Sequence, residues 1–266
     1  MVVALGGTAQ AQGELWSARA DDWAEVHEHN MRPVYEAVLD LVHAGPGMSI
    51  LEVGCGSGTA LRLAADRGAH VTALDAAPAM VEHARRRVPG AEISIGDLQF
   101  LPYRDASFDA VLGFNAFQYA ADPAEALREA HRVLRPGGMA AAMVWGPAEE
   151  CDLAPYLAAL GRLLPPPPPG APGPFALSQP GALRSLLAAA GLEVTLIADA
   201  AAAYAYADEE TALRGLLSAG PAVRAASIAG AEAARDATRA AIAPYIRPDG
   251  SVHTDNVWRF AIGRRA

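Results

Sequence analysis

Short apolar runs alternate with segments of helical spacing along residues 49–145. The apolar runs predict strands at residues 49–53, 70–74, 92–95, 108–113 and 140–145. The segments between them predict helices at residues 59–67, 78–87 and 123–134. This is the order of β-α-β units, and continuous apolar strands are typical of a parallel sheet that helices cover on both faces.

The segments that flank this core differ in character. Apolar positions at helical spacing predict helices at residues 14–30 and 33–43. Prolines are concentrated in residues 147–181, and the run at 165–169 predicts a rigid, extended connector because proline fixes φ and lacks an N–H. Beyond it, the pattern predicts helices at 181–190, 209–219 and 221–243 and strands at 193–198 and 257–263. The alanine-rich tract 200–240 is predicted to be helical.

Composition narrows the class of function. The 266 residues suit one large α/β domain, and the net charge of −9 disfavours nucleic acid, whose binders usually carry a basic surface. We therefore expect a small-molecule partner. All 21 basic residues are arginine, which excludes Schiff-base chemistry and the lysine of a phosphate-binding P-loop.

The chain shows no sign of a membrane segment or of disulfide chemistry. No apolar stretch approaches the roughly 20 residues that span a bilayer, and the N-terminus has no basic segment before its short apolar run. The two cysteines, Cys55 and Cys151, lie far apart, which fits a reducing compartment. We expect a cytoplasmic protein without membrane insertion.

A glycine-rich turn follows the first predicted strand. Residues 54–58 read Gly-Cys-Gly-Ser-Gly and lead into a helix, so bare backbone and the positive end of a helix meet at the carboxyl edge of the sheet. Asp75 ends the next strand about twenty residues later, where a carboxylate accepts both hydroxyls of a ribose. The pattern predicts a nucleoside ligand; the alternative is a tight turn that binds nothing.

Two details of the sequence distinguish between the possible nucleoside ligands. A dinucleotide-binding turn has the spacing G-x-G-x-x-G/A, but Thr59 stands at its third small position. Glu52, just before the turn, would direct a negative charge towards a pyrophosphate. Both details oppose a nicotinamide dinucleotide and favour a cofactor that carries a cationic amine and a sulfonium.

The segment Glu52-Val53-Gly54-Cys55-Gly56-Ser57-Gly58 resembles motif I of the class I S-adenosylmethionine-dependent methyltransferases. The resemblance is to the broad type 11 group, which includes the ubiquinone and menaquinone biosynthesis enzymes. Three further segments resemble that family in the same order, at residues 74–80, 96–109 and 134–138. The resemblance covers residues 50–145, and residues 147–250 correspond to the family's variable part.

The resemblance implies a Rossmann-like, doubly wound α/β fold. Its seven-stranded sheet is mostly parallel, and the C-terminal strand at 257–263 is antiparallel. A single methyltransferase domain would span residues 1–266. Within it we expect an N-terminal helical lid (1–45), a cofactor-binding core (46–146), a variable substrate-side region (147–250) and a C-terminal strand (251–266).

The resemblance also implies roles for individual residues. Glu52 would hold the ammonium group of the methionine moiety, and Asp75 would bind the ribose. Met80 would lie against the adenine, and Asp97 would accept its amine. The full expected cofactor-binding set is Glu52, Gly54, Cys55, Gly56, Gly58, Asp75, Ala76, Met80, Gly96, Asp97, Leu98 and Asn115.

Other candidate residues have weaker support. Asn115, with Gln118 and Tyr119 beside it, would open the substrate side. The weak candidates for a general base are His27, His29, Tyr206 and His253, among which the sequence makes no choice. His27 and His29 would point to different faces of a helix, so no metal is expected. Trp16 and Trp23 are expected to pack the N-terminal helix, and the arginine run 85–87 to complement the C-terminus of its helix.

The predicted function is methyl transfer from S-adenosyl-L-methionine to an oxygen, nitrogen or carbon of a small molecule, leaving S-adenosyl-L-homocysteine. The acceptor would be a natural product of bacterial-type secondary metabolism or a quinone-like metabolite, and the protein a monomer or homodimer. Three alternatives stay open: a fold relative that uses the bound cofactor for another reaction, methylation of a macromolecule, and a nicotinamide-dependent oxidoreductase.

Overall fold

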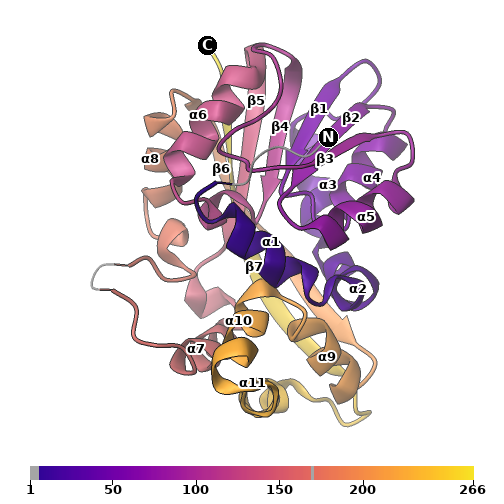
Figure 1. Ribbon diagram of the computed structural model, residues 1–266, viewed down its shortest axis with the longest axis vertical. Coiled ribbons are helices and arrows are strands. Elements are labelled where there is room, and N and C mark those ends of the chain that lie inside the picture. The colour runs from indigo at the N-terminus through magenta and orange to yellow at the C-terminus, as the bar shows by residue number, and fades with distance from the viewer. Residues whose placement is uncertain (1–5, 169–170) are drawn as a thin grey trace.

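A seven-stranded sheet forms the centre of the molecule (Figure 1). The computed structural model describes residues 6–168 and 171–266. The strand order is β3-β2-β1-β4-β5-β7-β6, in which β7 runs antiparallel to both of its neighbours and the other adjacent strands pair in parallel. The predicted fold class is confirmed. The strands are β1 Ser49–Val53, β2 His70–Asp75, β3 Glu92–Ile95, β4 Phe108–Phe114, β5 Leu134–Trp145, β6 Glu193–Tyr206 and β7 Val252–Arg264.

Both faces of the sheet are buried, as the continuous apolar strands require. Ile50 on β1 packs into the hydrophobic cluster that includes Val38 of α3. Its neighbour Leu51 points the other way, into the cluster that includes Leu127 of α6. The helices of the core are α3 Arg32–Leu41, α4 Thr59–Asp66, α5 Pro78–Arg87, α6 Pro123–Val133 and α8 Ala182–Ala189.

The N-terminal segment is not the single helix predicted for residues 14–30. It consists of α1 Ala9–Ser17, α2 Ala20–Asp22, a π-helical turn at Trp23–His27 and a 3-10 turn at Glu28–Met31. Val26, His27 and Glu28 are consecutive and all buried, which a regular helix with one solvent-facing side does not allow. The irregular turns therefore direct more side chains inward than helical periodicity predicts.

The C-terminal region also departs from the prediction. Residues 200–206, predicted to be helical, belong to β6, because the buried residues Ala202, Tyr204 and Tyr206 alternate with exposed ones and pair with β7. The predicted helix at 221–243 divides at Gly230, whose φ is +96°. The proline-rich part contains an unpredicted helix, α7, and the end of the run 165–169 lies outside the described residues. The helices here are α7 Ala154–Arg162, α9 Glu209–Leu216, α10 Gly220–Ala229 and α11 Ala231–Ile242.

These last helices lie beyond one end of the sheet, beside the long antiparallel pair of strands β6 and β7 (Figure 1). Helix α11 packs against α7, α9 and α10, and α1 connects this group to the core by packing against both α10 and α5. Among the described residues, none of the helices has the length and apolar character to cross a membrane.

Candidate functional site

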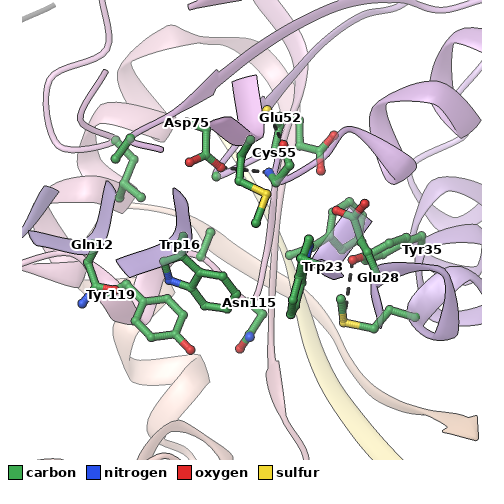
Figure 2. Close-up of a pocket in the computed structure, with 18 residues that line it drawn as sticks. Gln12, Trp16, Trp23, Glu28, Tyr35, Glu52, Cys55, Asp75, Asn115 and Tyr119 are labelled. Carbon is green, nitrogen blue, oxygen red and sulfur yellow. Dashed lines mark hydrogen bonds between the residues drawn. The ribbon is translucent and has the colours of Figure 1, made fainter. Parts of the chain in front are cut away.

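An internal cavity lies at the carboxyl ends of β1, β2 and β4, beneath the N-terminal segment (Figure 2). We call it the inner cavity. Its lining residues enclose about 710 Å³, with the space at its mouth included. The expected cofactor residues that line it are Glu52, Gly54, Cys55, Gly56, Asp75, Ala76, Met80, Leu98 and Asn115. The remaining lining residues are Gln12, Trp16, Trp23, Glu28, Met31, Tyr35, Phe114, Ala116 and Tyr119.

Three expected residues do not line the inner cavity. Gly58 instead forms the N-cap of α4, where its φ of +84° and an ideal Cβ 2.9 Å from the Ala84 Cα restrict the position to glycine. Gly96 and Asp97 follow β3, next to the lining residue Leu98. The Asp97 carboxylate is buried and accepts from the Gln99 N–H at 2.9 Å through Oδ1, while Oδ2 has no partner among the described residues.

The glycine turn exposes its backbone to the cavity. Gly54 and Gly56 have φ values of +69° and +52°, a region that L side chains rarely adopt. A Cβ on Gly56 would come within 2.7 Å of the Glu28 Oε1 and 3.5 Å of the Trp23 Nε1. The turn therefore has no room for a side chain at Gly56.

Asp75 links the glycine turn to the turn after β2. Its carboxylate accepts from the Gly56 N–H and from the Ala77 N–H, each at 2.8 Å. Burial raises the pKa of Asp75 to about 6, although these two backbone donors act in the opposite direction. Each carboxylate oxygen has a second lone-pair direction available, so the group can still accept from hydroxyls in the cavity.

Glu52 adds a second buried acid. Its Oε2 has no hydrogen-bond partner among the described residues. Burial raises the pKa of Glu52 well above its ordinary range, and the nearby carboxylates of Glu28 and Asp75 raise it further. Because a bound cation would stabilise the charged forms of Glu52 and Asp75, a cation is favoured over a pyrophosphate in this space.

The third acid, Glu28, fastens the N-terminal segment to the glycine turn. The carboxylate, 3% exposed, accepts from the Ser57 N–H at 3.2 Å and from the hydroxyls of Ser57 and Thr59. Arg87 pairs with it at 2.9 Å and also donates to the Ser57 carbonyl at 3.0 Å. Arg87 is therefore more than a charge at the end of α5, because it neutralises a buried acid from another segment.

Two tryptophans cover the cavity. Trp16 and Trp23 meet edge to face with their ring centres 4.9 Å apart, and both line the inner cavity (Figure 2). Both rings also pack against the hydrophobic core, so the packing role that the sequence predicts and a place in the cavity wall go together. The Trp23 Nε1 is buried and has no partner among the described residues, so it is a free donor beside the glycine turn.

A second, larger space adjoins the first, and we call it the outer cavity. It measures about 1530 Å³ with its open mouth included. Trp16, Trp23, Met31, Asn115 and Tyr119 line both cavities and form the wall between them. Asn115 holds a positive φ of +53° just after β4, which turns its side chain to this shared wall. Further walls come from α7, β6, β7, α9 and α10.

The structure brings together two of the four candidate bases. Tyr206 and His27 are hydrogen-bonded at 2.9 Å between the hydroxyl and Nδ1, and His27 lines the outer cavity. His29 is exposed and lines neither cavity. His253 lies on β7, where it contacts Asp255 at 3.2 Å, and is also outside both cavities.

Comparisons with known proteins agree with this geometry. A family model described as a methyltransferase domain matches residues 51–142. Residues 51–142 therefore form a methyltransferase domain of the kind that the motifs predicted, and S-adenosylmethionine is the cofactor of the methyltransferases that those motifs resemble.

Individual relatives match part of the chain. It is 39% identical over 108 residues to a malonyl-[acyl-carrier protein] O-methyltransferase of Serratia marcescens, covering 41% of this chain and 42% of that protein. A demethylmenaquinone methyltransferase of Renibacterium salmoninarum is 41% identical over 101 residues, covering 38% of this chain and 43% of that protein. The chain thus matches less than half the length of these two relatives.

A solved structure resembles this chain over nearly its whole length. The crystal structure of the [4+2]-cyclase SpnF matches with a TM-score of 0.60 at 20% identity, covering 99% of this chain and 98% of that one. At this level of identity the likeness concerns the fold alone. The likeness in fold therefore includes the region after residue 146.

Sequence reasoning expected an N-terminal lid but assigned none of its residues to the cofactor site. Gln12, Trp16, Trp23 and Glu28 all line the inner cavity. No local pattern indicates this, since Glu28 meets Ser57 and Thr59 only through the tertiary fold. The one available signal was that two tryptophans precede the core in a chain with only 6% aromatic residues.

The buried state of His27 predicts a pH-dependent stability. Burial and the nearby His29 lower the pKa of His27 to about 3, below its unfolded value of 6.5. As pH falls below 6.5, the unfolded chain binds a proton that the folded chain does not, so stability is lost. Relative to His27→Phe, the wild type should lose about 3 kcal/mol between pH 7.5 and 4.5.

Urea unfolding at the two pH values measures this difference. Tyr35→Phe is a suitable control, because it removes a buried hydroxyl on α3 that does not titrate in this range. Between the two pH values its free energy of unfolding should change by the same amount as that of the wild type. An equal change in the wild type and in His27→Phe would show that His27 is not buried as described.

Proposed function

We propose that this protein binds S-adenosyl-L-methionine in the inner cavity and transfers its methyl group to a small, largely apolar molecule in the outer cavity. In this proposal residues 46–146 form the cofactor side, and residues 147–250 with the N-terminal segment form the acceptor side. The acid-rich inner cavity and the apolar outer cavity share one wall, which supports placing a cationic donor beside an apolar acceptor.

The observation that carries the proposal is a set of buried polar atoms without partners. Glu52 Oε2 suits an ammonium group, the Trp23 N–H suits a carboxylate, and Asp97 Oδ2 suits an adenine amine. Buried groups of this kind are costly and uncommon in folded proteins. Together they complement the amino-acid and adenine ends of the cofactor.

When bound, the cofactor supplies a methyl group already activated by a sulfonium. The protein's part is to align the two reactants and exclude water, which contributes up to about 7–11 kcal/mol. Asp75 would hold the ribose, the bare backbone at Gly54 and Gly56 would admit the amino-acid portion, and Met80 would lie against the adenine. Asn115 would contact the methionine moiety from the shared wall.

Calorimetric titration with S-adenosylhomocysteine and with NAD tests cofactor choice. We expect binding of the first and none of the second. Mass spectrometry of the protein as purified would also identify any ligand that co-purifies with it. Transfer of a labelled methyl group from the cofactor to small molecules of a cell extract then tests the reaction; a bound cofactor without transfer would favour the alternative of another reaction on the same fold.

Replacing Asp75 with alanine should weaken S-adenosylhomocysteine binding at least about 100-fold. Two charge-assisted hydrogen bonds to the ribose would be lost, each contributing about 1.5–3 kcal/mol. The Gly56 N–H would also lose its acceptor and with it the shape of the turn. Asp66→Ala, which removes an exposed pair with Arg62, is the control and should bind normally. Equal affinity in wild type and Asp75→Ala would remove Asp75 from the site.

A further inference from the structure

The outer cavity has a mainly apolar wall with very few charges. Leu153, Leu157 and Leu160 line it from α7, and Leu216 from α9. Among the described lining residues the only ionic side chain is Arg224, which is exposed on α10. A site of this kind favours an apolar molecule held in place by a few polar contacts.

Two of its polar atoms are donors without acceptors. Tyr204 and Trp258 are each 1% exposed and line the outer cavity. The Trp258 N–H lies close enough to the Tyr204 hydroxyl to lower its pKa as a side-chain hydrogen bond does, against the rise that burial causes. Even so, neither the Tyr204 hydroxyl nor the Trp258 Nε1 forms a hydrogen bond with good geometry among the described residues. Both donors therefore lack the partner that buried polar groups normally have.

His27 adds a third donor to the same wall. The Tyr206 hydroxyl and the His27 Nδ1 are hydrogen-bonded, and in the tautomer in which the hydroxyl donates, the ring proton of His27 lies on Nε2. Trp23 packs against the imidazole with ring centres 4.7 Å apart and planes tilted by 33°, and Tyr204 meets it edge to face at 5.2 Å. The side chains of His27 and Tyr204 therefore lie next to each other in the wall of the outer cavity.

We propose that the outer cavity binds an apolar, ring-sized molecule that carries a carbonyl oxygen, held by the donors of Tyr204, Trp258 and His27. The chemical class is an enolisable or hydroxylated aromatic ketone, because a methyl acceptor needs a nucleophilic atom that a plain ketone or a quinone lacks. This inference rests on the proposed function, which makes the outer cavity the acceptor site. Neutral donors around the carbonyl oxygen also stabilise the negative charge of the enolate or phenolate of an acceptor that has already lost its proton to solvent.

The ionisation behaviour of the three residues agrees with a donor role. Burial raises the pKa of Tyr204, so its hydroxyl keeps its proton at physiological pH. Burial lowers the pKa of His27, so its imidazole stays neutral there. The unpartnered Gln118 Oε1 is an acceptor in the same wall and suits a hydroxyl on the bound molecule.

Two probes of matched size test this inference. Protein saturated with S-adenosylhomocysteine is titrated with 2-acetonaphthone and with 2-ethylnaphthalene, which differ chiefly in the carbonyl oxygen. The ketone should bind at least about tenfold more tightly, because a site with unpaired donors discriminates against a ligand without an acceptor. In Tyr204→Phe and in His27→Phe the preference should fall about threefold or more, with little change for the hydrocarbon.

Tyr156→Phe is the matched control. Tyr156 lines the same cavity, but its hydroxyl already donates to the Leu216 carbonyl at 2.7 Å. This variant should keep the preference for the ketone. Equal affinity for the two probes, no binding of either, or a preference that survives in both Tyr204→Phe and His27→Phe would overturn the inference. Failure of S-adenosylhomocysteine to bind in the first titration would instead contradict the proposed function, and the inference would fall with it.

Discussion

Replacing Arg87 with methionine is expected to lower the free energy of unfolding by about 3 kcal/mol. Removing one partner of a buried ion pair leaves the other charge uncompensated, at a cost of about 3–5 kcal/mol. The Glu28 side chain is only 4% exposed, whereas Arg87 is 29% exposed and water reaches part of it, so the lower end applies. The measurement is urea unfolding at pH 7.5.

The neighbouring residue provides the control. Arg86 pairs with Glu82 one helical turn away, and both side chains are more than half exposed. Exposed pairs of this kind contribute about 0.2–1 kcal/mol, so Arg86→Met should change stability little. We also expect Arg87→Met to loosen the segment that contains Glu28, which amide exchange of residues 23–31 would show. Similar stability losses in the two variants would contradict the role assigned to Arg87.

Replacing Gly56 with valine should abolish detectable S-adenosylhomocysteine binding, a loss of at least about 100-fold or 3 kcal/mol. The new side chain would occupy the space between the turn and Glu28, where an ideal Cβ already lies 2.7 Å from the carboxylate. A β-branched residue at a φ of +52° is also strained. The fold should therefore lose some stability as well, in contrast to a change that affects binding alone.

Gly47→Val separates the two effects. Gly47 also has a positive φ, +83°, but a Cβ there would have no neighbour within 4 Å. This variant carries the backbone strain without the close approach, so it should unfold more easily yet bind the cofactor normally. Calorimetry and thermal unfolding on both variants provide the comparison. Retained binding in Gly56→Val would contradict the close backbone approach at this turn.

The core could be predicted because its signals are local. Residues 49–53, 78–87 and 92–95 form the expected elements with the expected limits, since each combines an apolar pattern with a proline or glycine at its boundary. The glycine turn and Asp75 could be placed for the same reason. Strand ends that are near in sequence order lie together at one edge of a parallel sheet.

Features that depend on distant partners could not be predicted. Alanine favours helices, but Ala202 lies in a strand because β7, some fifty residues later, provides its pairing partner. Glu28 reads as an ordinary helical acid until the fold places Ser57, Thr59 and Arg87 around it. The assignments of individual cofactor residues therefore stay predictions that ligand binding must test.

Apart from their shared wall, the two cavities are lined by residues from separate stretches of the chain. Strand tips between residues 52 and 116 supply much of the inner cavity, whereas residues 153–258 supply most of the lining of the outer one. Mutations in residues 147–258 can therefore change the outer cavity while the inner cavity is retained. Grafting residues 147–258 between related proteins should, on this account, exchange preferences for one reactant without disturbing the other.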